Sequence, residues 1–106
     1  YLRRTIMVSL EKELQETIRN LEKIRDSQRP PSDDVLSALD KLYEQQIDLI
    51  DAAITKSTDE YTKATSAMNE AAKRTKEAID DLMKLEEAIN KVADAIGKVA
   101  ELLSKL

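Results

Sequence analysis

Carboxylates are the most abundant side chains of this 106-residue sequence that could take part in chemistry. It holds 21 aspartates and glutamates and three tyrosines, but no histidine or cysteine. The missing residues exclude thiol chemistry, disulfides, most zinc and haem sites, and the catalytic triads that need histidine. Helical bundles can hold two metal ions between glutamates, but those sites add Glu-x-x-His pairs. We therefore expect no catalytic residue, no cofactor-binding residue and no metal ligand, and hence no enzyme.

The individual residues that could be assigned a chemical role are better explained by structure. Asp33 follows a proline pair and suits a helix cap, and Asp40 lies in the first turns of the same predicted helix. Tyr43 and Tyr61 occupy core positions of a heptad pattern, where the ring packs and the hydroxyl stays near water. Gly97 is the only glycine and falls on the outer side of that pattern. A phosphate-binding loop needs more than one glycine, so none is predicted.

The charge balance points away from nucleic acid and from membrane spans. The net charge is −4, with 17 basic and 21 acidic residues. No apolar run approaches the ~18 residues of a transmembrane helix, and no signal peptide is recognised. We expect a cytoplasmic protein, or one exported without disulfides. Basic residues are scattered among acids and lack stacking aromatics, so nucleic-acid binding is not expected. The basic residues that could contact a nucleic acid are Arg3, Arg4, Arg19, Arg25, Arg29, Lys73, Arg74 and Lys76.

The strongest break in the sequence is the proline pair Pro30–Pro31, because neither residue can continue a helix. It predicts a first helix over about 2–28, a turn at 29–32, and a second helix that starts near 33 with Ser32 or Asp33 as its cap. Residues 1–29 hold seven basic and five acidic groups, whereas residues 30–56 hold two basic and six acidic groups. Opposite charge and a short link predict antiparallel neighbours.

From Tyr43 to Leu106 one heptad register continues, and its core positions are apolar except Ser57 and Thr75. Because a loop usually resets the register, this pattern favours one long helix over about 33–105. The alternative is a break near 57–60, where Ser57 and Glu60 match a capping box and the segment 55–66 is rich in serine and threonine. The first reading predicts a helical hairpin, and the second predicts a three-helix bundle.

The segment 84–106 contains a true heptad repeat, KLEEAIN-KVADAIG-KVAELLS-KL. Its acids precede its lysines by four residues, which is the favourable order for helical ion pairs. Positions that carry charge in a two-stranded coiled coil are mostly alanine or leucine here, so the buried side is wide. This helix is therefore expected to contact at least two others, as in a three- or four-helix bundle.

These observations predict an all-α fold, a single helical domain over 1–106. It would be an elongated antiparallel helical hairpin or three-helix bundle with heptad coiled-coil packing, completed by oligomerisation. A first helix of this length leaves 82–106 overhanging, and an exposed apolar surface of that extent is unusual for a monomer. We expect a non-catalytic assembly or interaction module, such as a scaffold, a secretion or phage assembly component or a neutralising partner. It would bind a second copy or another helical protein. The alternative is a membrane-active helical protein that inserts its C-terminal helix. The expected partner interface consists of Leu82, Leu85, Ile89, Val92, Ile96, Val99, Leu102, Leu103 and Leu106.

Overall fold

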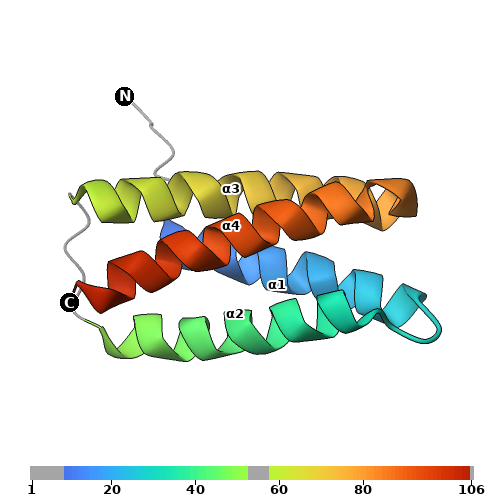
Figure 1. The fold of residues 1–106 in the computed structure, drawn as a ribbon, viewed down its shortest axis with the longest axis horizontal. Coiled ribbons are helices and arrows are strands. Elements are labelled where there is room, and N and C mark those ends of the chain that lie inside the picture. Colours follow the sequence, from blue (N-terminus) through green and yellow to red (C-terminus); the bar gives the residue numbers. More distant parts are fainter. Residues whose placement is uncertain (1–8, 53–57, 106) are drawn as a thin grey trace, which may run out of the picture.

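The computed structural model describes residues 9–52 and 58–105, which form four α-helices and one short 3₁₀-helix (Figure 1). The α-helices are α1 (Leu10–Ser27), α2 (Asp33–Asp51), α3 (Asp59–Asp80) and α4 (Leu85–Ser104), and the 3₁₀-helix η2 (Leu82–Lys84) lies between α3 and α4. The predicted all-α class is confirmed for this part of the chain, but it holds four α-helices in place of the predicted helical hairpin or three-helix bundle.

Side-chain caps fix where the first three helices begin. The hydroxyl of Ser9 accepts a hydrogen bond from the N–H of Lys12 (3.2 Å), and Ser32 accepts one from Val35 (3.2 Å). Thr58 does the same for the third helix, where the N–H of Tyr61 donates at 3.1 Å. Each bond satisfies a backbone donor that the first turn of a helix leaves free. Of the two predicted caps for the second helix, Ser32 is the one that makes the bond.

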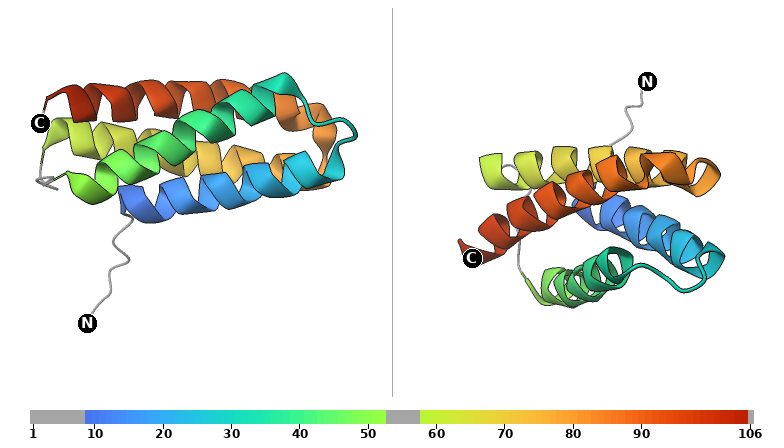
Figure 2. Two further views of the ribbon diagram at one scale, coloured as in Figure 1. Left: turned by 90° about the horizontal axis from the view of Figure 1, so that it is seen from below. Right: turned by 45° about the vertical axis from the view of Figure 1, so that its right-hand side comes forward.

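The helices form two antiparallel hairpins that lie side by side (Figure 1, Figure 2). α1 pairs with α2, and α3 pairs with α4. Between the hairpins, α1 runs parallel to α3, since Leu10 meets Tyr61 and Asn20 meets Ala72. α2 runs parallel to α4, with which it shares a hydrogen bond from Gln45 Nε2 to the carbonyl of Ile96. α3 and α4 pack together most extensively, and α2 packs least extensively against the rest.

The predicted continuous helix over 33–105 is wrong. α2 ends at Asp51, and α3 begins at Asp59 after its cap Thr58. The alternative of a break near 57–60 describes the chain better, although the cap lies one residue after Ser57. Serine and threonine side chains bond to nearby backbone groups and so compete with helix formation. Ser57 itself lies outside the described residues.

A second interruption, at Asp81, was not predicted. Asp81 has extended backbone angles, and its carboxylate accepts a hydrogen bond from the N–H of Met83 at 3.1 Å. The break favours the start of α4, because Glu86 and Glu87 then lie in its first turn, at the positive end of the helix dipole. It does not favour the end of α3, where Glu77, Asp80 and Asp81 lie at the negative end. Together with the end of α2 at Asp51, the break shortens the molecule to 41 Å, where an unbroken helix would extend about 110 Å.

The first helix ends close to its predicted limit but begins later. α1 ends at Ser27, one residue before the predicted end at 28. Its start near residue 2 was predicted on residues outside the described part of the chain, and Ser9 is an extended cap, so α1 itself begins at Leu10. Its buried side chains are five aliphatic residues, Thr17 and Glu13. They are Leu10, Glu13, Leu14, Thr17, Ile18, Leu21 and Ile24.

The heptad register holds in α3 and fails in α2. All core positions predicted for α3 are buried, including Thr75, whose hydroxyl donates to the carbonyl of Ala71. In α2 the pattern predicted Tyr43, Ile47 and Ile50 in the core. Ile47 and Ile50 are instead exposed, and the side that faces the bundle is rotated from the predicted one. The buried residues of α2 are Val35, Ala38, Leu39, Leu42, Gln45 and Leu49.

Candidate functional site

The predicted interface over 82–106 lies mostly inside this chain's own bundle. Val92, Val99 and Leu102 are buried. Four others are partly buried against the same core, namely Leu85, Ile89, Ile96 and Leu103. Leu82 is about half exposed in η2, and Leu106 lies outside the described residues. The premise that this segment overhangs is wrong, because the chain reverses twice and covers it with α3 and α2.

Among the described residues, most of the large exposed apolar side chains lie on α2. Ile47 is 62% exposed and Ile50 is 76% exposed, and Leu36 is also exposed. With the half-buried Tyr43 they recur at intervals of three, four and seven residues, so they follow one side of the helix. We call Leu36, Tyr43, Ile47 and Ile50 the outer stripe of α2. Exposed Met83 and Leu82 form a smaller apolar corner at η2.

Carboxylates border the outer stripe along one edge. Asp40 lies within the stripe's line, and Glu44, Asp48 and Asp51 follow beside it at helical spacing, all of them exposed. α2 as a whole carries six carboxylates and one basic residue, Lys41. A contiguous acidic edge beside an apolar stripe gives this surface a marked electrostatic preference for basic groups.

Tyr43 connects the outer stripe to α1. Its hydroxyl donates a hydrogen bond to the carboxylate of Glu22, which raises the pKa of Tyr43 above its ordinary value, and partial burial adds to the shift. The neighbouring Arg25 guanidinium acts in the opposite direction to a smaller extent. The contact holds the ring against the bundle, and the hydroxyl meets a carboxylate of α1.

Gln45 occupies a core position that an aliphatic residue would usually hold. It is buried, its Nε2 donates to the carbonyl of Ile96 at 2.9 Å, and its Oε1 has no hydrogen-bond partner among the described residues. Polarity would place Ile47 in the core and Gln45 at the surface, but Ile47 is exposed and Gln45 is buried. This reversal is why the sequence pattern placed the wrong side of α2 in the core.

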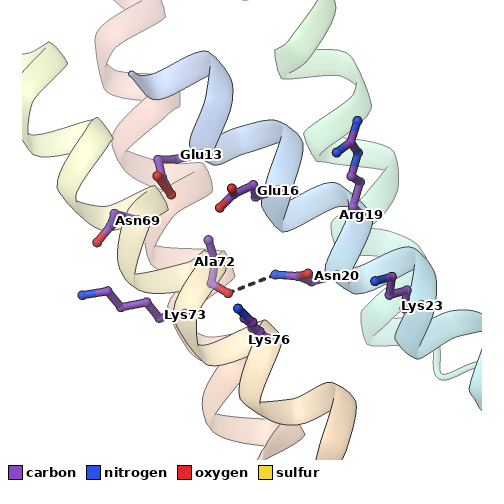
Figure 3. A pocket seen from close by; sticks show the side chains of 9 residues that line it. All are labelled: Glu13, Glu16, Arg19, Asn20, Lys23, Asn69, Ala72, Lys73 and Lys76. Carbon is purple, nitrogen blue, oxygen red and sulfur yellow. Dashed lines mark hydrogen bonds between the residues drawn. The ribbon is translucent and has the colours of Figure 1, made fainter. Parts of the chain in front are cut away.

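A polar cleft of about 360 Å³ opens between α1 and α3 (Figure 3). α1 contributes Glu13, Glu16, Arg19, Asn20 and Lys23, and α3 contributes Asn69, Ala72, Lys73 and Lys76. Asn20 Nδ2 donates to the carbonyl of Ala72 (3.0 Å) and to Thr75 Oγ1 (3.1 Å), which ties the two helices together at this point.

The charged groups of the cleft are unpaired within the described part of the chain. No carboxylate there lies within 4.0 Å of Arg19, Lys23, Lys73 or Lys76. Their neighbour Arg74 differs, since it contacts Glu70 (2.9 Å), Glu77 (3.4 Å) and Glu87 (3.2 Å). Those carboxylates, Glu70 foremost, raise the pKa of Arg74.

Glu13 is the unusual member of the cleft. It is only 7% exposed, and its Oε2 has no hydrogen-bond partner among the described residues. Sequence reasoning missed both Glu13 and the cleft, and it considered Arg19, Lys73 and Lys76 only as a nucleic-acid surface. The available signal was the spacing of Glu13 among the buried aliphatics of α1, which places a carboxylate on the core side.

Comparison with known proteins gives no relative for this chain: no family model, curated protein or solved structure matches it. The described residues hold no group of three or more ligating side chains that could bind a metal ion. None of the described helices combines the length and the apolar character needed to cross a bilayer.

Proposed function

We propose that this protein is a non-catalytic interaction module that binds a helical partner, and that the outer stripe of α2 is its contact surface. The observation that carries the proposal is the exposure of Ile47 and Ile50, two large aliphatic side chains one turn apart on the least covered helix. Aligned exposed aliphatics of this kind mark interaction sites more often than scattered single ones do.

The chemistry of the outer stripe defines the partner. An amphipathic helix that packs against α2 needs an apolar stripe at positions i, i+3 or i+4, and i+7. Asp40, Glu44, Asp48 and Asp51 then face one edge of that partner, which favours lysine and arginine there. The proposed partner is therefore a basic amphipathic helix from another protein. A second copy of this chain fits less well, because it would place two acidic α2 edges together.

The alternative of membrane insertion by the C-terminal helix has a structural cost. Val92, Val99 and Leu102 of α4 are buried in the bundle, so insertion needs α4 to leave it. Removing several fully buried aliphatic side chains from a core costs about 2–5 kcal/mol for each large one. The outer stripe of α2 needs no such rearrangement to meet a partner, which is why we favour protein binding.

The test uses a designed amphipathic peptide of 19 residues, the length of α2, with leucines on one side and lysines and arginines along one edge. Amide resonances of the protein are followed by NMR during titration. We expect shifts confined to α2 and binding that weakens with added salt. A matched peptide with glutamates in place of the basic residues should bind at least about tenfold more weakly.

Two paired variants locate the contact. Ile47→Gln with Ile50→Gln should abolish peptide binding while the circular dichroism of the fold is retained. Leu82→Gln with Met83→Gln removes the other exposed apolar corner and should leave binding unchanged. Equal binding of both peptides, or loss of binding only in the second variant, would refute the assignment to α2. Self-association through α2 would replace the proposed partner by a second copy.

A further inference from the structure

The cleft between α1 and α3 combines charged groups of both signs that form no ion pair with any described residue, and it lies apart from the outer stripe of α2. Its carboxylates, Glu13 and Glu16, come from α1, and its cations come from both helices, Arg19 and Lys23 from α1 and Lys73 and Lys76 from α3 (Figure 3). With four cations and two carboxylates, the cleft carries a charge of +2 in a chain whose net charge is −4.

The buried carboxylate of Glu13 indicates what the cleft lacks. Burying a polar atom without a hydrogen bond costs free energy, and the cost is larger when the group is charged. Glu13 Oε2 is a buried polar atom with no hydrogen-bond partner among the described residues. Glu13 lines the cleft, and its side chain is more than nine-tenths buried. A donor placed in the cleft would satisfy it, and a cationic donor would also neutralise its charge.

The basic residues decide which cationic donor fits. A simple amine or a polyamine would be repelled by the lysines and Arg19. A molecule that carries both an ammonium and anionic groups avoids this repulsion. Its anionic groups can contact the basic residues while its ammonium contacts Glu13. With two anions and one ammonium the ligand carries a net charge of −1, which is opposite in sign to the charge of the cleft.

We propose that the α1–α3 cleft binds a small molecule with one primary ammonium and two anionic groups, the ammonium on Glu13 and the anions among Arg19, Lys73 and Lys76. Acidic amino acids have this composition, and so does the headgroup of phosphatidylserine. Asn20 ties α1 to α3 through its bonds to Ala72 and Thr75, which fixes how far the α1 carboxylates lie from the α3 lysines.

The experiment is an NMR titration of the whole chain with L-glutamate, and in parallel with glutarate, which has the same two carboxylates but no ammonium. We expect saturable shifts at the α1 and α3 amides that line the cleft, with glutamate binding about tenfold more tightly than glutarate. Absence of glutamate shifts at millimolar concentration, or equal affinity for the two compounds, would overturn the proposal.

Variants assign the contacts. Glu13→Gln should weaken glutamate about tenfold and leave glutarate unchanged, whereas Lys73→Gln and Lys76→Gln should weaken both compounds. Glu101→Gln and Lys91→Gln, exposed on α4, are the matched controls and should change neither. If Glu13→Gln does not fold, the exposed lysine variants still decide the matter, because unchanged binding in both of them contradicts the assignment.

Vesicles distinguish the source of the ligand. Sedimentation with vesicles that contain phosphatidylserine, and no sedimentation with phosphatidylcholine alone, supports the headgroup, provided that L-glutamate competes and that Lys73→Gln weakens it. Glutamate binding without vesicle binding supports a free small molecule. Vesicle binding that glutamate and Lys73→Gln leave unchanged places the membrane contact elsewhere and contradicts the proposal for that source.

Discussion

Two truncations on α2 distinguish the buried side of the helix from the side that the heptad pattern predicts. Leu42 is fully buried, whereas Ile47, five residues later, is 62% exposed. The heptad pattern implies the reverse, with Ile47 in the core. Leu42→Ala and Ile47→Ala each remove three carbon atoms from an aliphatic side chain, so the pair compares the two positions with almost the same chemical change.

The expected magnitudes follow from burial. Three buried carbon atoms at about 0.8 kcal/mol each give about 2.4 kcal/mol for Leu42→Ala, and the remaining cavity raises the loss toward 2–5 kcal/mol. For Ile47 only about two fifths of that transfer term applies, which is about 0.9 kcal/mol. Alanine is also the better helix former by several tenths of a kcal/mol. The net loss for Ile47→Ala should therefore be near 0.5 kcal/mol.

Urea unfolding followed by circular dichroism measures both changes in the free energy of unfolding. For a domain of this size a loss of 1 kcal/mol lowers the melting temperature by about 4–8 °C, so Leu42→Ala should lower it by at least about 10 °C. Ile47→Ala should lower it by only a few degrees. A loss for Ile47→Ala that equals or exceeds the loss for Leu42→Ala would refute the observed side of α2 and the proposed contact surface with it.

Three further predictions concern single side chains. Thr58→Ala removes the α3 cap and should cost about 1 kcal/mol of unfolding free energy; a cost below about 0.3 kcal/mol would contradict its capping role. Gln45→Met removes a buried oxygen that has no hydrogen-bond partner among the described residues, so urea unfolding should show unchanged stability or a gain of up to about 1 kcal/mol, and a clear loss would contradict this. Tyr43 should ionise above its ordinary pKa of 10.0, because its hydroxyl donates to Glu22. Since the pKa of Tyr43 is raised in the folded protein, the hydrogen bond from Tyr43 to Glu22 stabilises the fold below pH 10. This stabilisation is lost as pH rises through the folded pKa. Tyr43→Phe should remove a tyrosinate absorbance step that lies above pH 10, and a titration curve left unchanged above pH 10 would disprove the shift.

The parts of the fold that follow directly from sequence are those where pattern and punctuation agree. The proline pair ends α1 and separates it from α2, and Ser32 provides the next cap. The alanine-rich flanks of 84–106 predicted a helix that contacts at least two others, and α4 packs against both α3 and α2. In each case a local signal and a global requirement lead to the same structure.

The errors have a common cause in hydrophobic periodicity. A heptad pattern continues through a break when the number of residues between two helices happens to preserve its phase. The pattern therefore could not reveal the ends of α2 and α3. In α2 two stripes compete, and ranking by hydrophobicity prefers Ile47 to Gln45. The structure buries Gln45 because its amide finds the carbonyl of Ile96, a contact between helices that sequence spacing does not contain.

The prediction of an interface at 82–106 depended on both errors, the missed helix ends and the wrong buried side of α2. A long unbroken helix left Leu85, Ile89 and Val92 without cover, and a partner chain was the simplest way to bury them. Two reversals of the chain bury them against α2 and α3 instead. The polar cleft was beyond sequence reasoning for a different reason. Its residues come from two helices whose parallel pairing is set by contacts such as Asn20 with Ala72.

The mass of the free protein in sedimentation equilibrium tests the central claim most directly. That claim is that residues 82–106 complete the chain's own core and that the outer stripe of α2 binds a basic helix from another protein. It predicts a monomer of 12.0 kDa at micromolar concentration, with Ile47→Gln and Ile50→Gln leaving the mass unchanged. A stable oligomer that persists in this double variant, and that dissociates when Leu82, Leu85 and Ile89 are made polar, would contradict it.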